Sequence, residues 1–482
     1  MSELRRLSRR EFLKRTGQTT SGLVLAVSFG ACSRTSDEVA PTASDAPASF
    51  MPNVYVNLKS DGQVEIHCHR SEMGQGIRTG LPQVIADELD ADWDRIELIQ
   101  APGGEQYGDQ NTDGSTSIRR QFDLLRNAGA SAREMLLMAA AARWQVDRSE
   151  LITRDHAVHH EASGQSAGYG DLVAEAAALE LPETVSFKSP DEYRYIGASM
   201  DLIDGFDMTT GRAMYGTDTV LPGMLYASIE RPPVLGGTIV SLDDTKAREI
   251  PGVVDVVRMP DATSPPVFNP LGGVAVLATN TWAATRARKR LKIEWDLGAN
   301  AEYDSAAYRE ALIATSHEEG SPILNRGDVA AALDSAATVI EADYYAPHLA
   351  HASMEPPAAT ARMNPDGTCD VWSCTQNPQS VQQTVSGLLD LEIGQVKAHV
   401  TLLGGAFGRK SKADFPAEAA WLARETGKPV KVSWTREDDL RLGYLHSVSA
   451  QHLRGALDAD GKVTGWLHRT VFPSISSTFD SE

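Results

Sequence analysis

The stretch 400–410, with the sequence VTLLGGAFGRK, holds the residues whose types and spacing are best suited to chemistry. The β-branched residues of 396–403 predict a strand, three glycines lie among the next five residues, and 416–426 predicts a helix. This order makes a cradle of backbone N–H groups that can hold an anion. We expect Arg409 and Lys410 to add positive charge at its mouth. A tight connection without a ligand is the alternative that the pattern leaves open.

The spacing of this loop excludes two common nucleotide-binding motifs. Arg409 separates Gly408 from the Lys410–Ser411 pair, which a nucleoside-triphosphate loop places directly after a glycine. The glycines also do not match the dinucleotide-binding fingerprint. The ligand of the cradle has to be inferred from the rest of the chain.

A second glycine loop, EMGQG, occupies residues 72–76. It follows a predicted hairpin of strands 54–58 and 64–68, and precedes a helix that ends at Leu89 with Pro82 near its start. The glycines free the backbone, and Gln75 can both donate and accept hydrogen bonds. Loop 101–117 is long and rich in Gly, Asp, Thr and Ser, which is typical of functional loops. A long helix over 118–144 follows it.

Gln376 lies in the sequence Thr-Gln-Asn-Pro-Gln after a predicted strand, in a turn that Pro378 makes rigid. His348 and His351 lack a clear helix and a third ligand, so we interpret them as structural and predict no metal bound by protein ligands. The four cysteines are too scattered for a disulfide framework or an iron–sulfur cluster.

The composition describes a globular protein. A chain of 482 residues with 42% apolar residues can form two to four domains. The formal charge of −20 and the pI near 5.1 argue against nucleic acid as a partner. From Gly211 onward, short strands between Pro and Gly predict a compact β-rich module with a helix at 244–250, and 448–477 has the character of a sheet.

The N-terminus predicts export. Ser8-Arg9-Arg10-Glu11-Phe12-Leu13-Lys14 and an apolar run to Cys32 resemble a twin-arginine signal, so we expect residues 1–32 to be a signal peptide and residues 33–50 a solvated linker. This route exports folded proteins, which suits a cofactor inserted in the cytoplasm, and predicts a periplasmic location. Cys32 is either a lipid anchor or an incidental cysteine beside a cleaved signal.

Together these segments resemble the large, molybdenum-binding subunit of the xanthine oxidase and aldehyde oxidase family, of the isoquinoline 1-oxidoreductase β-subunit type. The matching segments are 74–76, 114–117, 211–295, Met354-Glu355-Pro356, Thr375-Gln376 and 404–410. The resemblance implies an α+β, multi-domain molybdopterin-binding fold. It assigns residues 51–200 to a permuted molybdopterin-binding segment, 205–296 to an α/β hammerhead domain, and 297–482 to a first molybdopterin-binding domain with an incomplete C-terminus.

The resemblance also implies a site. The cofactor would be molybdenum-molybdopterin in its cytosine dinucleotide form, whose dithiolene supplies sulfur to the metal. Gln376 matches the family glutamine that hydrogen-bonds a metal oxo group, and Phe407 matches the phenylalanine beside the molybdenum. The implied cofactor contacts are Gly74, Gln75, Gly76, Ser115, Thr116, Gly404, Gly405, Phe407, Gly408 and Arg409. We expect the loops of 74–76 and 404–408 to bring unshielded N–H donors close to its phosphate or pterin oxygens.

The implied activity is oxidation of an aldehyde or an isoquinoline-like N-heteroaromatic compound with oxygen from water. Electrons would pass to a small [2Fe–2S] subunit, with a c-type cytochrome as a further candidate partner. Ser411 replaces a substrate-binding glutamate of the purine branch, and Ala406 replaces a family glycine. The family's catalytic base is expected beyond Glu482. An exported solute-binding lipoprotein and an inactive truncated scaffold are the alternatives.

Overall fold

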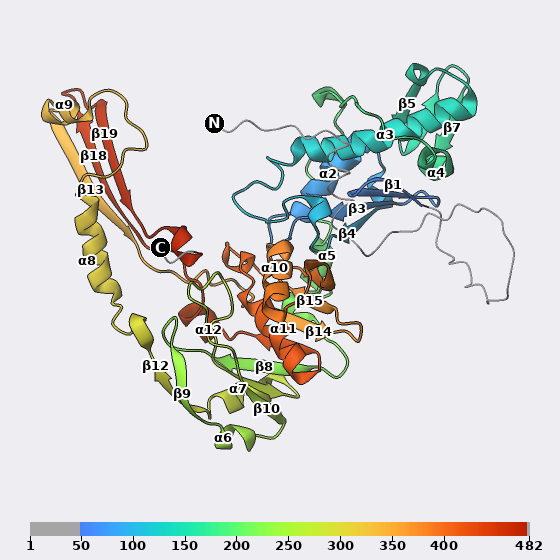
Figure 1. Cartoon of the computed structure of the whole chain (residues 1–482). Coiled ribbons are helices and arrows are strands. Elements are labelled where there is room, and N and C mark those ends of the chain that lie inside the picture. The colour runs from blue at the N-terminus through green and yellow to red at the C-terminus, as the bar shows by residue number, and fades with distance from the viewer. Residues whose placement is uncertain (1–48, 480–482) are drawn as a thin grey trace. The chain divides into compact units, whose positions relative to one another are not determined.

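The computed structural model of the chain describes residues 49–479 (Figure 1). The predicted signal peptide 1–32, with Cys32, lies outside the described residues. So does the predicted linker 33–50, apart from Ser49 and Phe50, which open the first strand. Helices and strands are mixed throughout the described part, which confirms the α+β class.

The first part of the described chain is a four-stranded sheet packed against three helices. The strand order is β1-β2-β3-β4, antiparallel except for β3 and β4, which are parallel and joined through α2. Apolar residues of the sheet and helices form one buried core. The elements are β1 (Ser49–Asn53), β2 (Val56–Lys59), β3 (Val64–Cys68), α2 (Ile77–Leu89), β4 (Ile96–Gln100), α3 (Phe122–Trp144) and α4 (Tyr169–Ala177).

The predicted hairpin, the strand near residue 96 and the long helix α3 are confirmed. One position is wrong: Pro82 lies inside α2 and not near its start, because the helix already begins at Ile77. A small antiparallel sheet was not predicted. It consists of β5 (Leu151–Arg154), β6 (Ala157–His160) and β7 (Gln165–Gly168).

A seven-stranded sheet forms the second core. Its order is β10-β11-β8-β17-β14-β15-β16, with β8/β17 and β15/β16 parallel. Strand β11 reads VAVLA and is buried along its whole length, as expected for a strand covered on both faces. The strands are β8 (Leu225–Glu230), β10 (Val253–Arg258), β11 (Val274–Ala278), β14 (Ala358–Met363), β15 (Cys369–Ser373), β16 (Val396–Val400) and β17 (Val430–Ser433).

This sheet crosses the predicted boundary at residue 296, because three of its strands come from 205–296 and four from 297–482. The helices α10 (Pro378–Leu389) and α11 (Asp414–Thr426) pack on it, and Gly427 caps α11 in the left-handed conformation (Figure 1). The strand and helix predicted around the loop of 404–410 are therefore confirmed. Elements not predicted here are α7 (Thr281–Arg288), α10 and strand β9.

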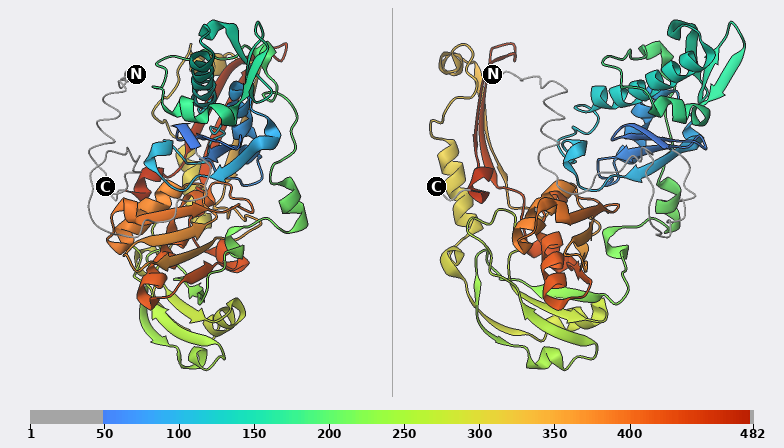
Figure 2. Two further views of the ribbon diagram at one scale, coloured as in Figure 1. Left: turned by 90° about the vertical axis from the view of Figure 1, so that its right-hand side faces the viewer. Right: turned by 45° about the vertical axis from the view of Figure 1, so that its right-hand side comes forward.

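The predicted helix at 244–250 is the single turn α6 (Thr245–Arg248), and α12 (Arg436–Arg441) follows β17. Outside the large sheet, β9 (Thr238–Asp243) pairs with β12 (Lys292–Asp296). A separate three-stranded sheet has the order β13-β18-β19, and α8 and α9 pack against it (Figure 2). Its elements are α8 (Ser305–Ser316), α9 (Val329–Asp334), β13 (Thr338–Ala346), β18 (Ser449–Leu457) and β19 (Val463–Val471).

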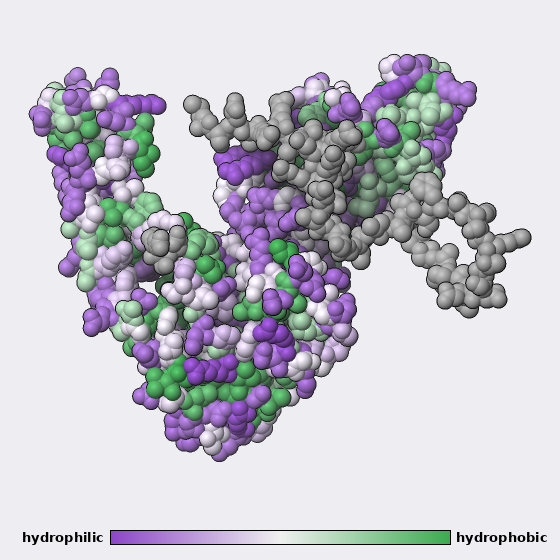
Figure 3. Space-filling model, in the orientation of Figure 1, coloured by the Kyte–Doolittle hydropathy of each residue, from purple (hydrophilic) through white to green (hydrophobic). Residues whose placement is uncertain are grey.

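Large apolar side chains are exposed on the β13-β18-β19 sheet, among them Ile340, Tyr344 and Trp466. The space-filling view shows apolar areas beside hydrophilic ones over these elements (Figure 3). Within residues 49–479, no helix combines the length and apolar character that a bilayer crossing requires.

Two βαβ units of the same design position the loops that the sequence singled out. β3, α2 and β4 form one unit, and β15, α10 and β16 form the other. In both units an aspartate, Asp90 or Asp390, ends the helix in the left-handed conformation with φ of 54°. Because parallel strands end at the same edge, each unit brings the loops after its two strands together.

Candidate functional site

All the predicted site residues lie in the loops that follow these four parallel strands. Gly74 to Gly76 come after β3, Ser115 and Thr116 after β4, Gln376 after β15, and the loop of 404–410 after β16. The carboxyl ends of parallel strands are the usual place for a ligand. The topology thus gathers residues that are about 330 positions apart in the sequence.

Backbone hydrogen bonds join the two units. Leu403 donates to the carbonyl of Glu72 at 2.9 Å, and Gly103 donates to the carbonyl of Ala398 at 3.0 Å. Thr112 donates to the carbonyl of Gln376 at 2.9 Å. The glycine loop of 72–76, the long loop of 101–117 and the loop of 401–410 are therefore in direct contact.

Gln376 links the long loop of 101–117 to the glycine loop of 404–410. Its side chain is buried, donates from Nε2 to the carbonyl of Thr112 at 2.7 Å, and accepts at Oε1 from the N–H of Gly408 at 3.0 Å. Asn377 caps α10 and Pro378 opens it, so the backbone at Gln376 is held by a helix start. One hydrogen of the amide remains for a ligand.

The loop of 404–410 depends on left-handed backbone. Gly405 has φ of 82° and Gly408 has φ of 96°, which glycine adopts freely. Phe407 has φ of 55° and exposes 70% of its surface, although a bulky residue rarely takes this conformation. Strain of this kind persists where the surrounding structure imposes it, and it often marks functional loops.

Most N–H groups of this loop already have acceptors. Gly404 donates to Oε2 of Glu355, Gly405 to the carbonyl of Leu403, and Gly408 to Gln376. The N–H groups of Ala406 and Phe407 have no acceptor among residues 49–479. The cradle that the sequence predicts is thus narrower than expected: Ala406 is 0% exposed, so of these two N–H groups only that of the exposed Phe407 is left for a ligand.

Arg409 and Lys410 do not bring free charge to the mouth of the cradle, so that expectation is wrong. Both side chains are buried. Arg409 forms two hydrogen bonds to the carboxylate of Asp414, at 2.8 and 2.6 Å, and lies over the ring of Trp434. Lys410 donates to Glu355 at 2.9 Å. A buried cation is stable only when it is paired, and the helix start supplies Asp414.

Glu355 holds the loop of 404–410 in place through hydrogen bonds. Its Oε1 accepts from the N–H and the hydroxyl of Thr217, at 3.0 and 2.9 Å, and its Oε2 accepts from Gly404 and Lys410, at 3.0 and 2.9 Å. Burial by itself would raise the pKa of Glu355, but Lys410 and the N–H donors hold it below the usual value. The carboxylate is ionised and saturated. Glu355 of the Met-Glu-Pro motif therefore positions the chain at this loop.

Glu72 has the same role at the other glycine loop. Its buried carboxylate accepts from the N–H groups of Gly74 and Gly76, both at 2.9 Å, and from that of Arg78 at 3.0 Å. It occupies the N-terminus of α2, where an anion is favourable. The expectation of unshielded donors at Gly74 and Gly76 is therefore wrong. Gln75 folds back on its own loop, to Met73 and Ser71.

Ser115 forms the tip of a tight turn. Gly114 and Ser115 have φ of 54° and 56°, and Thr116 donates back to the carbonyl of Asp113 at 3.0 Å. Ser115 is exposed, whereas the hydroxyl of Thr116 is bonded within the turn, also to Asp113. Only Ser115 of this pair offers its side chain to a ligand.

Several polar atoms near these loops are buried without a partner. His69 is 1% exposed and both its ring nitrogens, like the hydroxyl of Ser71, have no hydrogen bond among the described residues. Burial, followed by the charge of Arg70, lowers the pKa of His69 to about 4. His69 is therefore neutral at physiological pH.

Sequence reasoning did not find Glu72, Thr217 or Thr112. Glu72 and Thr112 hold predicted site residues in place, and Thr217 holds Glu355, which in turn bonds Gly404. Glu72 had a usable signal, because an acidic residue shortly before a helix start is favoured there. Thr217 and Thr112 act through backbone and hydroxyl groups at long sequence separation, which no local pattern shows.

Comparison with known proteins identifies the class. Two models, each described as a molybdopterin cofactor-binding domain, match residues 3–213 and 315–473. The chain is 32% identical to the β-subunit of the isoquinoline 1-oxidoreductase of Brevundimonas diminuta, over 97% of this chain and 64% of that protein. It is also 32% identical to a membrane-bound aldehyde dehydrogenase (pyrroloquinoline-quinone) of Gluconacetobacter polyoxogenes, over 94% of this chain and 59% of that protein.

The B subunit of the nicotinate dehydrogenase of Pseudomonas putida is 27% identical over 91% of this chain and 37% of its own length. Among solved structures, the aldehyde oxidoreductase of Desulfovibrio gigas matches with a TM-score of 0.45 and 22% identity, over 61% of this chain and 38% of that chain. The chain thus spans less than two thirds of the curated relatives named here. It belongs to the molybdopterin-binding large subunits of the xanthine oxidase family.

The predicted domain boundaries and the predicted roles of the site residues stay predictions. The residues present do fit such a cofactor. The N–H group of Phe407 and one amide hydrogen of Gln376 suit phosphate or pterin oxygens, and a Cβ at Gly74 would meet no heavy atom within 4 Å. Burial raises the pKa of Cys369 and Cys374 to about 12, so these thiols stay protonated and are poor metal ligands. Sulfur for a metal would then come from the pterin.

Proposed function

We propose that the protein acts as the large subunit of a molybdenum hydroxylase that oxidises an aldehyde or an N-heteroaromatic ring carbon. The observation that carries the proposal is the junction of Gln376 with the loop of 404–410. This junction combines one buried amide, the free backbone N–H of Phe407 and the exposed aromatic ring of the same residue. The family membership gives it a cofactor.

When bound, the cofactor would supply the redox centre and the site at which water becomes the oxygen donor. This chain's residues would bind and orient it. Phe407 would donate to its oxygens from the backbone, and Gln376 would donate from Nε2. The ring of Phe407, held outward by its left-handed backbone, would form an apolar wall against which a flat substrate can lie.

The proton acceptor of the reaction is not one of the two buried carboxylates on which the glycine loops are built. Glu355 accepts four hydrogen bonds and Glu72 accepts three, so both are engaged by the loops that they hold. We infer that the base belongs to another part of the protein.

We further propose the cytosine dinucleotide form of the cofactor, electron transfer to a [2Fe–2S] subunit, and export through the signal of Arg9 and Arg10 to the periplasm. The designations of the relatives support a protein partner, because a β-subunit and a B subunit are parts of larger enzymes. The molybdopterin-domain matches give no support to the solute-binding alternative.

The test is oxidation of isoquinoline, nicotinate and an aldehyde with an artificial electron acceptor, using the complete natural protein with its iron–sulfur subunit. Gln376→Leu should lower the rate while the protein stays folded. Gln382→Leu is the matched control, because Gln382 is a buried glutamine of α10 that donates to Val396 instead. Absence of molybdenum from the wild-type protein, or equal rates in the two variants, would refute the proposal.

A further inference from the structure

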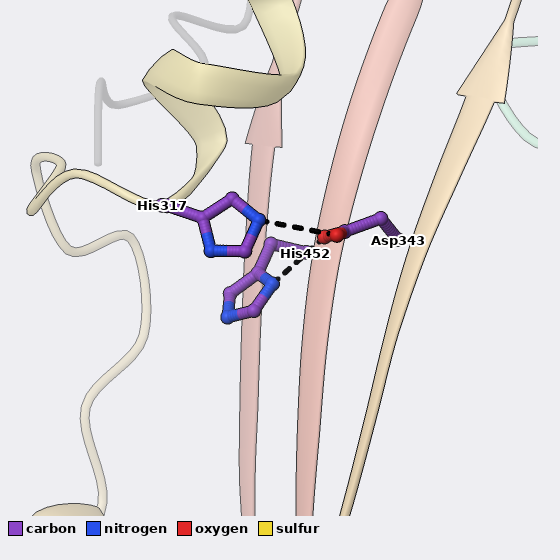
Figure 4. Close-up of side chains that lie close together, drawn as sticks. All are labelled: His317, Asp343 and His452. Carbon is purple, nitrogen blue, oxygen red and sulfur yellow. Dashed lines mark hydrogen bonds and ion pairs between the residues drawn. The ribbon is translucent and has the colours of Figure 1, made fainter.

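Three side chains with metal-binding groups meet on the β13-β18-β19 sheet, apart from the glycine loops. His317 follows the C-terminus of α8, Asp343 lies on β13 and His452 on β18 (Figure 4). Nε2 of His317 is 3.1 Å from Oδ2 of Asp343, and Nδ1 of His452 is 2.8 Å from Oδ1. The two imidazole rings are 4.0 Å apart between centroids.

The sheet fixes the backbone of this group. Asp343 is the direct cross-strand neighbour of His452, and His452 is the direct neighbour of Arg469 on β19. Arg469 donates from Nη1 to the backbone carbonyl of His317 at 2.7 Å, which ties the end of α8 to the same row. Direct neighbours in an antiparallel pair keep their Cβ atoms about 5 Å apart, so the arrangement is largely formed in advance.

An ordinary histidine–aspartate pair looks different in this protein. Nε2 of His399 lies 2.8 Å from one oxygen of Asp370, but the other oxygen of Asp370 is bonded to Arg362 and Asn364. Among the described residues, Asp343 has no such arginine or amide: each of its two oxygens faces an imidazole nitrogen. Two imidazoles on one carboxylate are more than a simple ion pair needs.

A second carboxylate lies behind His452. Oε1 of Glu341 is 3.8 Å from Nε2 of His452, the nitrogen that does not face Asp343, and Arg454 holds the other oxygen of Glu341 at 3.1 Å. Histidines that bind metals commonly present their second nitrogen to a carboxylate, which orients the ring. The same arrangement is present here: the carboxylate of Glu341 faces one nitrogen of His452, and the other nitrogen is in position to bind a metal.

We propose that His317, Asp343 and His452 bind one divalent transition-metal ion of the zinc type. The three ligand atoms lie within 4.8 Å of one another. In a tetrahedral site with bonds of about 2.1 Å, ligand atoms are about 3.4 Å apart, so small side-chain movements complete the geometry. Two nitrogens and one oxygen suit zinc better than calcium or magnesium, which prefer oxygen alone.

Such an ion would connect three chain segments, because its ligands come from the end of α8 and from two strands. Water would fill the fourth position, since three protein ligands leave one open. The site lies in a different sheet from the two βαβ units, and the proposal does not depend on the molybdenum cofactor.

The experiment uses the full chain without a histidine tag, after dialysis against a chelator. Zinc binding is measured by titration calorimetry and by metal analysis after equilibrium dialysis, and cobalt is added separately as a spectroscopic probe. We expect one equivalent of zinc per chain and cobalt absorption bands of a nitrogen- and oxygen-ligated, low-coordinate site. A result without stoichiometric binding would overturn the proposal.

The variants decide which residues are responsible. His317→Ala is the main test, because the side chain is 43% exposed and its loss leaves no cavity, whereas His452 is buried. His317→Ala and Asp343→Asn should abolish the stoichiometric binding, and Glu341→Gln should weaken it about 10- to 100-fold. His399→Ala is the control and should bind zinc like the wild type. Equal binding by His317→Ala and His399→Ala would place the ion elsewhere and refute the site.

Discussion

Replacing Glu355 by glutamine should strongly destabilise the protein. Each oxygen of the carboxylate faces two donors, Thr217 twice on one side and Gly404 with Lys410 on the other. Glutamine keeps one oxygen only, so its NH₂ group must face two donors in either orientation. The side chain of Lys410 is 0% exposed and would lose the carboxylate with which it forms its ion pair. Breaking a buried pair in this way costs about 3 to 5 kcal/mol.

The assay is urea unfolding of the wild type and of Glu355→Gln, Lys410→Met and the double variant, followed by tryptophan fluorescence. In the double variant neither charge of the pair remains unpaired. Its decrease in the free energy of unfolding should therefore be at least about 1 kcal/mol smaller than the sum of the decreases in the two single variants. Glu134→Gln is the control, because Glu134 pairs with Arg148 on the surface and such pairs contribute about 0 to 1 kcal/mol. A Glu355→Gln variant as stable as the control, or strictly additive losses, would refute the assigned network.

Three further changes test other parts of the structure. Metal analysis should show that Gly405→Asn and Gly405→Val lose molybdenum, since Gly405 has φ of 82° and lies beside Phe407. Gly427→Asn is the control and should keep molybdenum, because Gly427 ends a helix in the left-handed conformation and a Cβ there would meet no heavy atom within 4 Å. Replacing Arg9 and Arg10 by lysine should leave the protein in the cytoplasm on cell fractionation, and unchanged export would contradict the signal. The pKa of buried His69 is lowered from 6.5 to about 4, so between these pH values the histidine takes up a proton in the unfolded chain but not in the folded one. The free energy of unfolding should therefore fall by about 3 kcal/mol as the pH drops from 6.5 to 4. His69→Phe should remove this loss in denaturation curves measured across that range, and an unchanged pH profile would show that His69 is not the responsible group.

Local patterns were sufficient for the elements around the site. The β-branched run before the glycines, the alanine-rich helix after them and Gly427 at its end each follow from short-range preferences, and all three are found. The helix α10 was not predicted although Asn377 and Pro378 form a good helix start, because Asn and Pro are equally typical of a rigid turn. β5, β6 and β7 are each four residues long, which is too short for a clear alternating pattern.

The charges of the site could not be predicted in the same way. Arg409 and Lys410 follow a glycine loop, and exposed basic residues at such a place usually indicate an anion-binding site. Their burial depends on Asp414, five residues after Arg409, and on Glu355, about fifty residues earlier. The donors of Gly74 and Gly76 were likewise expected to be free, but Glu72 takes them. Which donor finds which acceptor is a tertiary property, whereas the choice of loops was already visible in the sequence.

The internal carboxylates of the two glycine loops have a consequence for the order of assembly. Glu72 and Glu355 already hold Gly74, Gly76 and Gly404 in place, so the conformational entropy of these turns is lost when the chain folds and not when a ligand arrives. A binding site formed in this way keeps its backbone conformation before the ligand binds. Cofactor binding would then be a separate step after folding, with little rearrangement of the backbone. Folded protein without cofactor could accumulate and bind the cofactor whenever it becomes available.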